Sequence, residues 1–181
     1  FILEKMQIRN FISSAKRKDL DEKIEKNLMP EFTAMNVGLF VTDAGMNISG
    51  LVGEMALEVY NFIKPNTIHK TNKYSKGMPK KVILPWIIEH YIGGGKAYIS
   101  YHKKDKLKDL DNIFHLLDGK GVVKYPGDLI TKIEANDASN EIETEYFLAK
   151  WYNNKNLHLT FKRIDLLNKL GMMATHNIIH S

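Results

Sequence analysis

Residues 153–171, NNKNLHLTFKRIDLLNKLG, decide the fold because they join a turn, a strand and the start of a helix. Every second side chain of the strand is apolar: Leu157, Leu159 and Phe161. The side chains between them are polar: His158, Thr160 and Lys162. Because side chains alternate across a strand, this pattern predicts one face against a core and one face open to a ligand.

The preceding segment, residues 141–152 (EIETEYFLAKWY), is rich in β-favouring and aromatic residues and predicts the partner strand of a hairpin. We take Asn154 and Lys155 as a two-residue turn. The resulting register pairs Trp151 with His158, Ala149 with Thr160 and Phe147 with Lys162, and sets Glu145 diagonal to Lys162. After the hairpin, Asp165 is expected to cap a short helix over residues 166–170, which Gly171 ends.

Three stretches carry a resemblance to a known family: IFHLLDGKG (residues 113–121), EYF (145–147) and WYNNKNLHLTFKRIDLLNKL (151–170). They resemble the bacterial and phage family called domain of unknown function 4942, mainly over residues 107–171. Members of that family occur alone or beside adenine-specific DNA methyltransferase domains, so the resemblance implies a genomic context and no mechanism. The family usually has Asn-Gly where this chain has Asn154 and Lys155.

The amino-acid composition limits the classes of protein to which the chain can belong. The chain has 181 residues and no cysteine, which excludes disulfides, thiolate zinc sites and a cysteine nucleophile. It shows no run of 18 apolar residues and no signal-peptide pattern, so we expect a cytoplasmic protein without a membrane segment. The chain starts at Phe1 without methionine, which is typical of a fragment or a processed product.

Positive charge is concentrated in one part of the chain. The net charge is +5, yet residues 59–106 alone hold ten lysines and two acids. Residues 64–81 contain six lysines, one tyrosine and no acid, and predict a loop that contacts phosphates while Tyr74 stacks on a base. An ordinary solvated loop is the alternative. The predicted nucleic-acid-binding residues are Lys70, Lys73, Tyr74, Lys76, Lys80, Lys81, Trp151 and Thr160.

The pattern along the chain predicts an α+β fold, with a helical N-terminal part followed by a small antiparallel sheet, a C-terminal β-hairpin and a short terminal helix. We expect a helical arm over residues 1–30 and a single domain over 31–181, with a basic loop at 64–81. Periodicity predicts further helices at 51–63, 82–92 (ended by the glycines at 93–95), 105–117 and 128–135, and strands at 37–42 and 97–102.

The polar residues of the hairpin could carry out metal-independent ribonuclease chemistry. A carboxylate or a neutral imidazole would take the 2′-hydroxyl proton, a second imidazole would protonate the leaving oxygen, and cations would stabilise the transition state. The candidates for acid and base are Glu145, His158 and His115, and the candidate cations are Lys162 and Arg163. The alternative is that these residues form ordinary surface pairs.

Other chemistry finds less support in the sequence. His176 and His180 are four residues apart but lack a third ligand, so we expect no metal. The five prolines are isolated, which excludes the Asp/Asn-Pro-Pro-Tyr/Phe element of adenine methylases, and no glycine-rich cofactor loop is present. We therefore expect no cofactor and no methyltransferase activity.

Two functions from different classes follow. The first is a nucleic-acid-binding protein of a phage, plasmid or bacterial defence or DNA-modification locus, whose enzymatic version is a ribonuclease-like toxin. The second is a non-catalytic interaction module, whose N-terminal helices bind a methyltransferase, an antitoxin or a defence-complex protein.

Overall fold

The computed structural model describes residues 11–31, 33–64, 78–90 and 96–180. In chain order its elements are α2 (Ser14–Glu25), α3 (Ala34–Met46), α4 (Ile48–Ile63), β1 (Lys81–Leu84), β2 (Ile88–His90), β3 (Ala97–Ile99), α5 (Tyr101–Leu117), α6 (Leu129–Ala135), β4 (Glu141–Glu143), β5 (Phe147–Trp151), β6 (Leu157–Phe161) and α7 (Ile164–His180). This arrangement confirms the predicted α+β class, with a helix-rich N-terminal part and a C-terminal hairpin followed by a helix.

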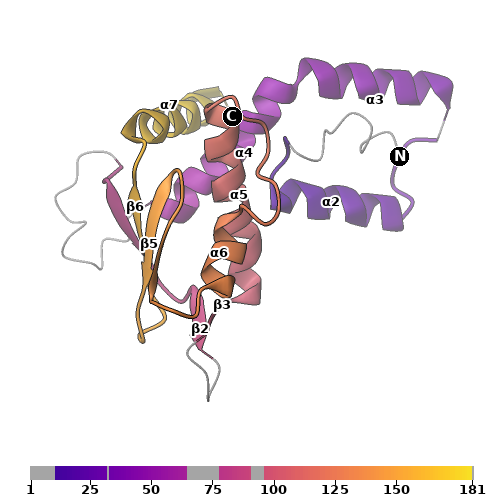
Figure 1. The fold of residues 1–181 in the computed structure, drawn as a ribbon. Coiled ribbons are helices and arrows are strands. Elements are labelled where there is room, and N and C mark those ends of the chain that lie inside the picture. Colours follow the sequence, from indigo (N-terminus) through magenta and orange to yellow (C-terminus); the bar gives the residue numbers. More distant parts are fainter. Residues whose placement is uncertain (1–10, 32, 65–77, 91–95, 181) are drawn as a thin grey trace.

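A four-stranded antiparallel sheet in the order β1-β6-β5-β4 forms one side of the molecule. Figure 1 shows α4, α5 and α6 against one face of this sheet and α7 across its end. Alternate residues of β5 and β6 are buried on that face, as expected for strands with one face on a core. No helix of the described ranges packs on the other face, which we call the open face.

Phe114 of α5 packs against the β5–β6 hairpin. Its ring lies 5.5 Å from that of Phe161 and 5.0 Å from that of Phe147, centroid to centroid, and all three side chains are fully buried. Burying side chains of this size stabilises a fold by about 2 kcal/mol each. The apolar face of β6 that the sequence predicts is therefore the centre of the core.

The predicted register of the hairpin is wrong by one residue. Trp151 pairs with Leu157, Ala149 with Leu159 and Phe147 with Phe161. The loop has three residues instead of two: the Lys155 N–H donates to the Tyr152 carbonyl over 2.9 Å, and Lys155 adopts a φ of +67°. The extra residue moves Trp151 and Phe147 onto the core face, whereas His158 and Thr160 keep the predicted polar facing.

Two predicted elements are of the wrong type. Residues 82–92 were expected to be helical, but β1 and β2 occupy the described part of this range, because Val82 and Leu84 alternate into the core beside β6. Residues 37–42, expected as a buried strand, lie in helix α3. A short apolar run does not distinguish a strand from a helix without its partners. The glycines at 93–95 lie outside the described residues.

Two predicted boundaries are also wrong. The strand expected over 97–102 ends at Ile99, and α5 begins at Tyr101. Helix α7 continues through Gly171 to His180. Leu166, Leu167 and Leu170 of this helix pack into the core, and their burial outweighs the cost of roughly 1 kcal/mol for a glycine in a helix. Helices predicted at 51–63, 105–117 and 128–135 are confirmed as α4, α5 and α6.

A buried carboxylate attaches α2 to α5. Asp109 is 1% exposed and accepts hydrogen bonds from the Ser14 backbone N–H at 2.9 Å and the Ser14 hydroxyl at 2.7 Å. Arg17 Nη2 lies 3.3 Å from the same carboxylate. Burial raises the pKa of Asp109, although these partners favour its charged form. The start of α2 is thereby held by polar contacts, and Figure 1 shows α2 and α3 on the side of the molecule away from the sheet.

We predict that Asp109→Ala lowers the free energy of unfolding by about 3 kcal/mol, because the half-buried Arg17 and the buried Ser14 lose the acceptor of their hydrogen bonds. Urea unfolding measures this change. The matched control is Asp105→Ala, which removes an exposed ion pair with Lys18 and is expected to cost less than about 1 kcal/mol. Equal losses in the two variants would contradict the anchoring role of Asp109.

Candidate nucleic-acid interface

The basic segment of the sequence leads directly into the sheet beside the polar face of the hairpin. Lys81, at its end, is the first residue of β1 and lies opposite Thr160 of β6. Two residues further along β1, Ile83 lies opposite His158 of β6. His158 in turn lies opposite Lys150 of β5. Residues paired in this way share one face of a sheet, so Lys81 lies on the open face together with Thr160 and His158 of the hairpin.

Acidic side chains on the open face belong to β4, at the edge away from β1. Glu141 lies 3.2 Å from the Lys150 ammonium, and Glu143 lies 2.6 Å from that of Lys162. The hydrogen bond from Lys162 lowers the pKa of Glu143. Lys81 is flanked in its row by the neutral Thr160, so within the described part of the sheet the β1 edge carries positive charge and the β4 edge carries the acids.

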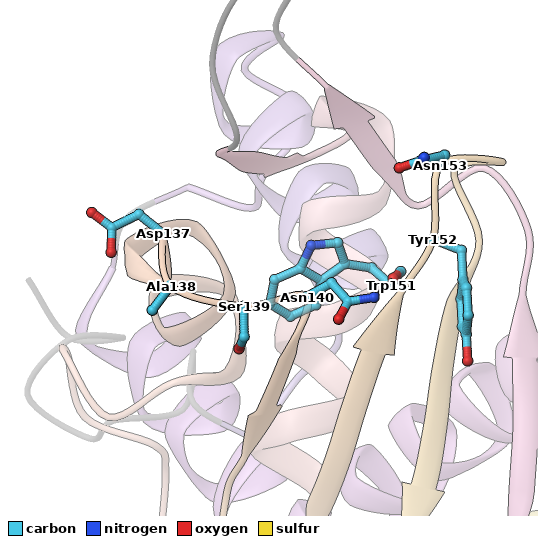
Figure 2. Close-up of a pocket in the computed structure, with 7 residues that line it drawn as sticks. All are labelled: Asp137, Ala138, Ser139, Asn140, Trp151, Tyr152 and Asn153. Carbon is cyan, nitrogen blue, oxygen red and sulfur yellow. Dashed lines mark hydrogen bonds between the residues drawn. The ribbon is translucent and has the colours of Figure 1, made fainter.

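Two aromatic rings lie at the hairpin end of the open face. The rings of Tyr152 and His158 are 4.4 Å apart and tilted by 47°. Trp151, which the predicted register placed on this face, is instead 3% exposed on the core side. Figure 2 shows Trp151 and Tyr152 pointing in opposite directions from the end of β5. Tyr152 therefore takes the place that the sequence assigned to Trp151.

A cavity of about 550 Å³ lies beside the end of β5. The hydrogen bond from Asn140 Nδ2 to the Trp151 carbonyl, at 2.9 Å, holds the two sides of this cavity together. The described residues that line it include one acid and no base, so it does not fit a phosphate. They are Asp137, Ala138, Ser139, Asn140, Trp151, Tyr152 and Asn153 (Figure 2).

Several predicted catalytic residues surround Asp118, at the C-terminal end of α5. Its carboxylate lies 3.0 Å from Arg163 Nη1, 3.0 Å from Lys120 Nζ and 3.0 Å from the Tyr146 hydroxyl, which donates to it. Lys120 also bonds to Glu145. The hydrogen bond from Lys120 is the main reason that the pKa of Asp118 is lowered, and burial is the main reason that the pKa of Tyr146 is raised to about 12.

The acid and base candidates are divided between two places. The His115 ring lies 4.8 Å from that of Tyr146, with its Nδ1 2.9 Å from the Asp111 carbonyl oxygen, so it borders the Asp118 cluster together with Glu145 and Arg163. His158 lies instead on the open face. The Glu145 and Arg163 charges are each matched by an opposite charge of the chain itself, as in a structural ion-pair network.

Trp86 is a prominent residue that the sequence prediction missed. It lies in the turn between β1 and β2, is 68% exposed and has a φ of +57°, which is rare for a bulky residue. The Ile87 and Ile88 N–H groups both donate to the Lys155 carbonyl over 3.0 Å, and Lys155 Nζ lies 5.9 Å from the indole centroid. The sequence does hold a signal for this turn, because Pro85 and Trp86 follow the alternating residues 81–84. The helix expected over 82–92 obscured it.

Some predicted residues cannot be placed. Lys70, Lys73, Tyr74 and Lys76 lie outside the described residues. Within the described ranges, no group of three histidine, aspartate or glutamate side chains could hold a metal ion, and no helix is long and apolar enough to cross a membrane. His176 and His180 fall in α7, but the description of the structure does not extend to their side chains.

A comparison with protein families matches the chain to one of them. The model of a family described as a domain of unknown function (DUF4942) matches residues 1–178, so the likeness extends well beyond residues 107–171. No curated protein and no solved structure matches the chain.

We predict that Trp86→Gly leaves the free energy of unfolding unchanged or raises it by up to about 1 kcal/mol. Glycine relieves the left-handed backbone strain of about 1–2 kcal/mol, and its greater freedom in the unfolded chain offsets part of that gain. The control is Trp151→Ala, which empties a buried site and is expected to cost about 3–5 kcal/mol. Urea unfolding compares the two variants. A large loss for Trp86→Gly would mean that the indole supports the fold.

We predict that Arg163→Gln changes stability in a pH-dependent way. The hydrogen bonds from Arg163 hold the pKa of Asp165 at about 2, below its usual 3.8. A lowered acid pKa stabilises the fold above pH 3.8, and that stability is lost as the pH falls toward 2. The difference in unfolding free energy between parent and variant should therefore be largest above about pH 4 and disappear toward pH 2. A difference that is constant with pH, or one also seen in Lys169→Gln, would contradict this.

Proposed function

The chain belongs to the DUF4942 family, and we propose that it is a nucleic-acid-binding protein of a phage, plasmid or bacterial defence or DNA-modification locus. The interface is the open face of the sheet together with the β1 edge. The observation that carries this proposal is the pairing of Lys81, the last residue of the basic segment, with Thr160 among the polar side chains of the hairpin.

The chemistry of this surface supports a polyanion as the ligand. Ammonium groups at the β1 edge provide an attraction that is independent of base sequence. Thr160 offers a hydroxyl for phosphate or sugar, and the Tyr152 and His158 rings offer surfaces for bases. An antiparallel sheet without a helix on one face is a known platform for unpaired nucleotides, because its side chains form a broad, flat surface.

Binding without cleavage is preferred over a metal-independent ribonuclease toxin. Cleavage needs an acid and a base on either side of one phosphate. His115 and Glu145 border the Asp118 cluster, whereas His158 lies on the open face. The ion pairs of Glu145 with Lys120 and of Arg163 with Asp118 would have to open before either residue could act on a substrate.

A protein-interaction module that partners a methyltransferase, an antitoxin or a defence complex is the second candidate. One observation favours it: α3 exposes Met35 by 75% and Leu39 by 60% on a helix that extends away from the sheet. Exposed apolar side chains on one element are typical of binding surfaces. An interaction module would leave all nucleic acids unbound in the assay below.

We predict that the protein binds RNA or DNA oligonucleotides with an affinity that falls steeply between about 50 and 200 mM salt. Fluorescence anisotropy of labelled single-stranded and duplex oligonucleotides measures this affinity. Lys81→Gln should weaken binding several-fold and reduce the slope of log affinity against log salt by about one, because one phosphate contact is lost.

The matched control is Lys23→Gln, which changes an exposed lysine of α2, away from the sheet. This variant should bind like the parent. An affinity that does not depend on salt, or equal effects of the two substitutions, would contradict the proposed interface. Incubation with total RNA in excess chelator tests cleavage in parallel, with His115→Ala and Glu145→Gln as the variants that should abolish it if the ribonuclease form were correct.

A further inference from the structure

Trp86 is held in an unfavourable backbone conformation without the gain of burial. Its φ of +57° is uncommon for a large side chain, and 68% of the residue is exposed, in contrast to the 3% of Trp151. Backbone strain of this kind persists only where the surroundings impose it. Here the Lys155 carbonyl imposes it by accepting from both Ile87 and Ile88. The β5–β6 loop therefore holds the backbone of the turn whose indole is exposed to solvent.

One lysine lies over this indole, and two more line a neighbouring cavity. Lys155 lies over the ring, with its Nζ 5.9 Å from the centroid. Pro85 and Ile87, the neighbours of Trp86 in sequence, line a cavity of about 330 Å³ between the end of α4, β1 and the first turn of α5. The described residues around this cavity include two lysines and no acid: Asn61, Phe62, Lys64, Ile83, Leu84, Pro85, Ile87 and Lys103.

An exposed indole with one lysine over its ring and two lysines in a neighbouring cavity matches the chemistry of an unpaired nucleotide. The face of a base stacks on the ring and the flanking phosphates meet the lysines, a combination typical of proteins that bind single strands. In a duplex the base faces are covered by stacking on their neighbours and cannot reach the ring. The lysines would repel a cationic partner, and the charge complementarity therefore favours a single-stranded polyanion.

We propose that Trp86 and Lys155 form a stacking site for one unpaired base of single-stranded RNA or DNA, with an adjacent phosphate bound in the cavity between Lys64 and Lys103. This inference rests on the proposed nucleic-acid-binding function and adds to it the class of ligand. The turn that carries Trp86 would then give the preference for single strands, and the β1 edge would attract the phosphates of any nucleic acid.

The test compares Trp86→Ala with the parent for binding of an oligothymidylate, an oligouridylate and a duplex of equal length. Stacking of a base contributes about 1–3 kcal/mol, so we expect single-strand affinity to fall about 5- to 100-fold, with little change for the duplex. Trp86→Phe should restore part of the lost affinity. Tyr125→Ala is the control, because Tyr125 is also an aromatic residue, 83% exposed.

Fluorescence gives a direct second measurement, because the chain has only two tryptophans. In Trp151→Phe the emission comes from Trp86 alone, and addition of the oligothymidylate should quench it in a saturable, salt-sensitive manner. Lys103→Gln should weaken single-strand binding several-fold without abolishing the quenching.

The possible results separate the two proposals. If the parent binds and Trp86→Ala binds single strands as tightly, the stacking site is wrong while the nucleic-acid-binding function stands. If the parent binds no nucleic acid, both are wrong, and an acidic peptide that quenches Trp86 would instead indicate a protein ligand. Loss of single-strand binding with retained duplex binding supports the stacking site.

Discussion

The three-residue loop between β5 and β6 determines the arrangement of most surfaces described above. Because Lys155 takes the left-handed backbone conformation, the loop closes with one residue more than a tight two-residue turn. This sends Phe147, Ala149 and Trp151 into the core and leaves Lys150 beside His158. The carbonyl of the same residue holds the turn that carries Trp86. Core packing, the open face and the exposed indole thus share one backbone conformation.

Helix α5 organises the other half of the molecule through carboxylates as well as apolar side chains. Asp109 accepts from the start of α2, and Asp111 accepts from the Leu129 N–H at the start of α6 over 2.7 Å. Both carboxylates are almost fully buried, and burial raises the pKa of each. Each one supplies an acceptor to backbone N–H groups that a helix start leaves unsatisfied. The helices are therefore positioned by directional bonds, which fix their orientation as well as their distance.

The sequence predicted those features that depend on local pattern. The α+β class, the alternating faces of β6 and the helices α4, α5 and α6 follow from hydrophobic periodicity. Features that depend on distant partners were missed. The described part of residues 82–92 holds strands β1 and β2 because β6 and β3 offer edges to pair with, and Gly171 stays helical because α7 packs into the core. The register error came from one loop residue and concealed the burial of Trp151, whereas the helix expected over 82–92 concealed the position of Trp86.

The polar attachment of α2 gives the chain an uneven distribution of stability. Among the residues of α2, only Ser14 is buried, so this helix adds almost no apolar surface to the core. Segments with few buried apolar contacts open at a lower free energy than the whole molecule. Amide hydrogens of α2 accordingly exchange with solvent through partial opening, while those of β5 and β6 exchange only when the fold is lost. Helix α2 can therefore be released while the sheet and its open face stay intact.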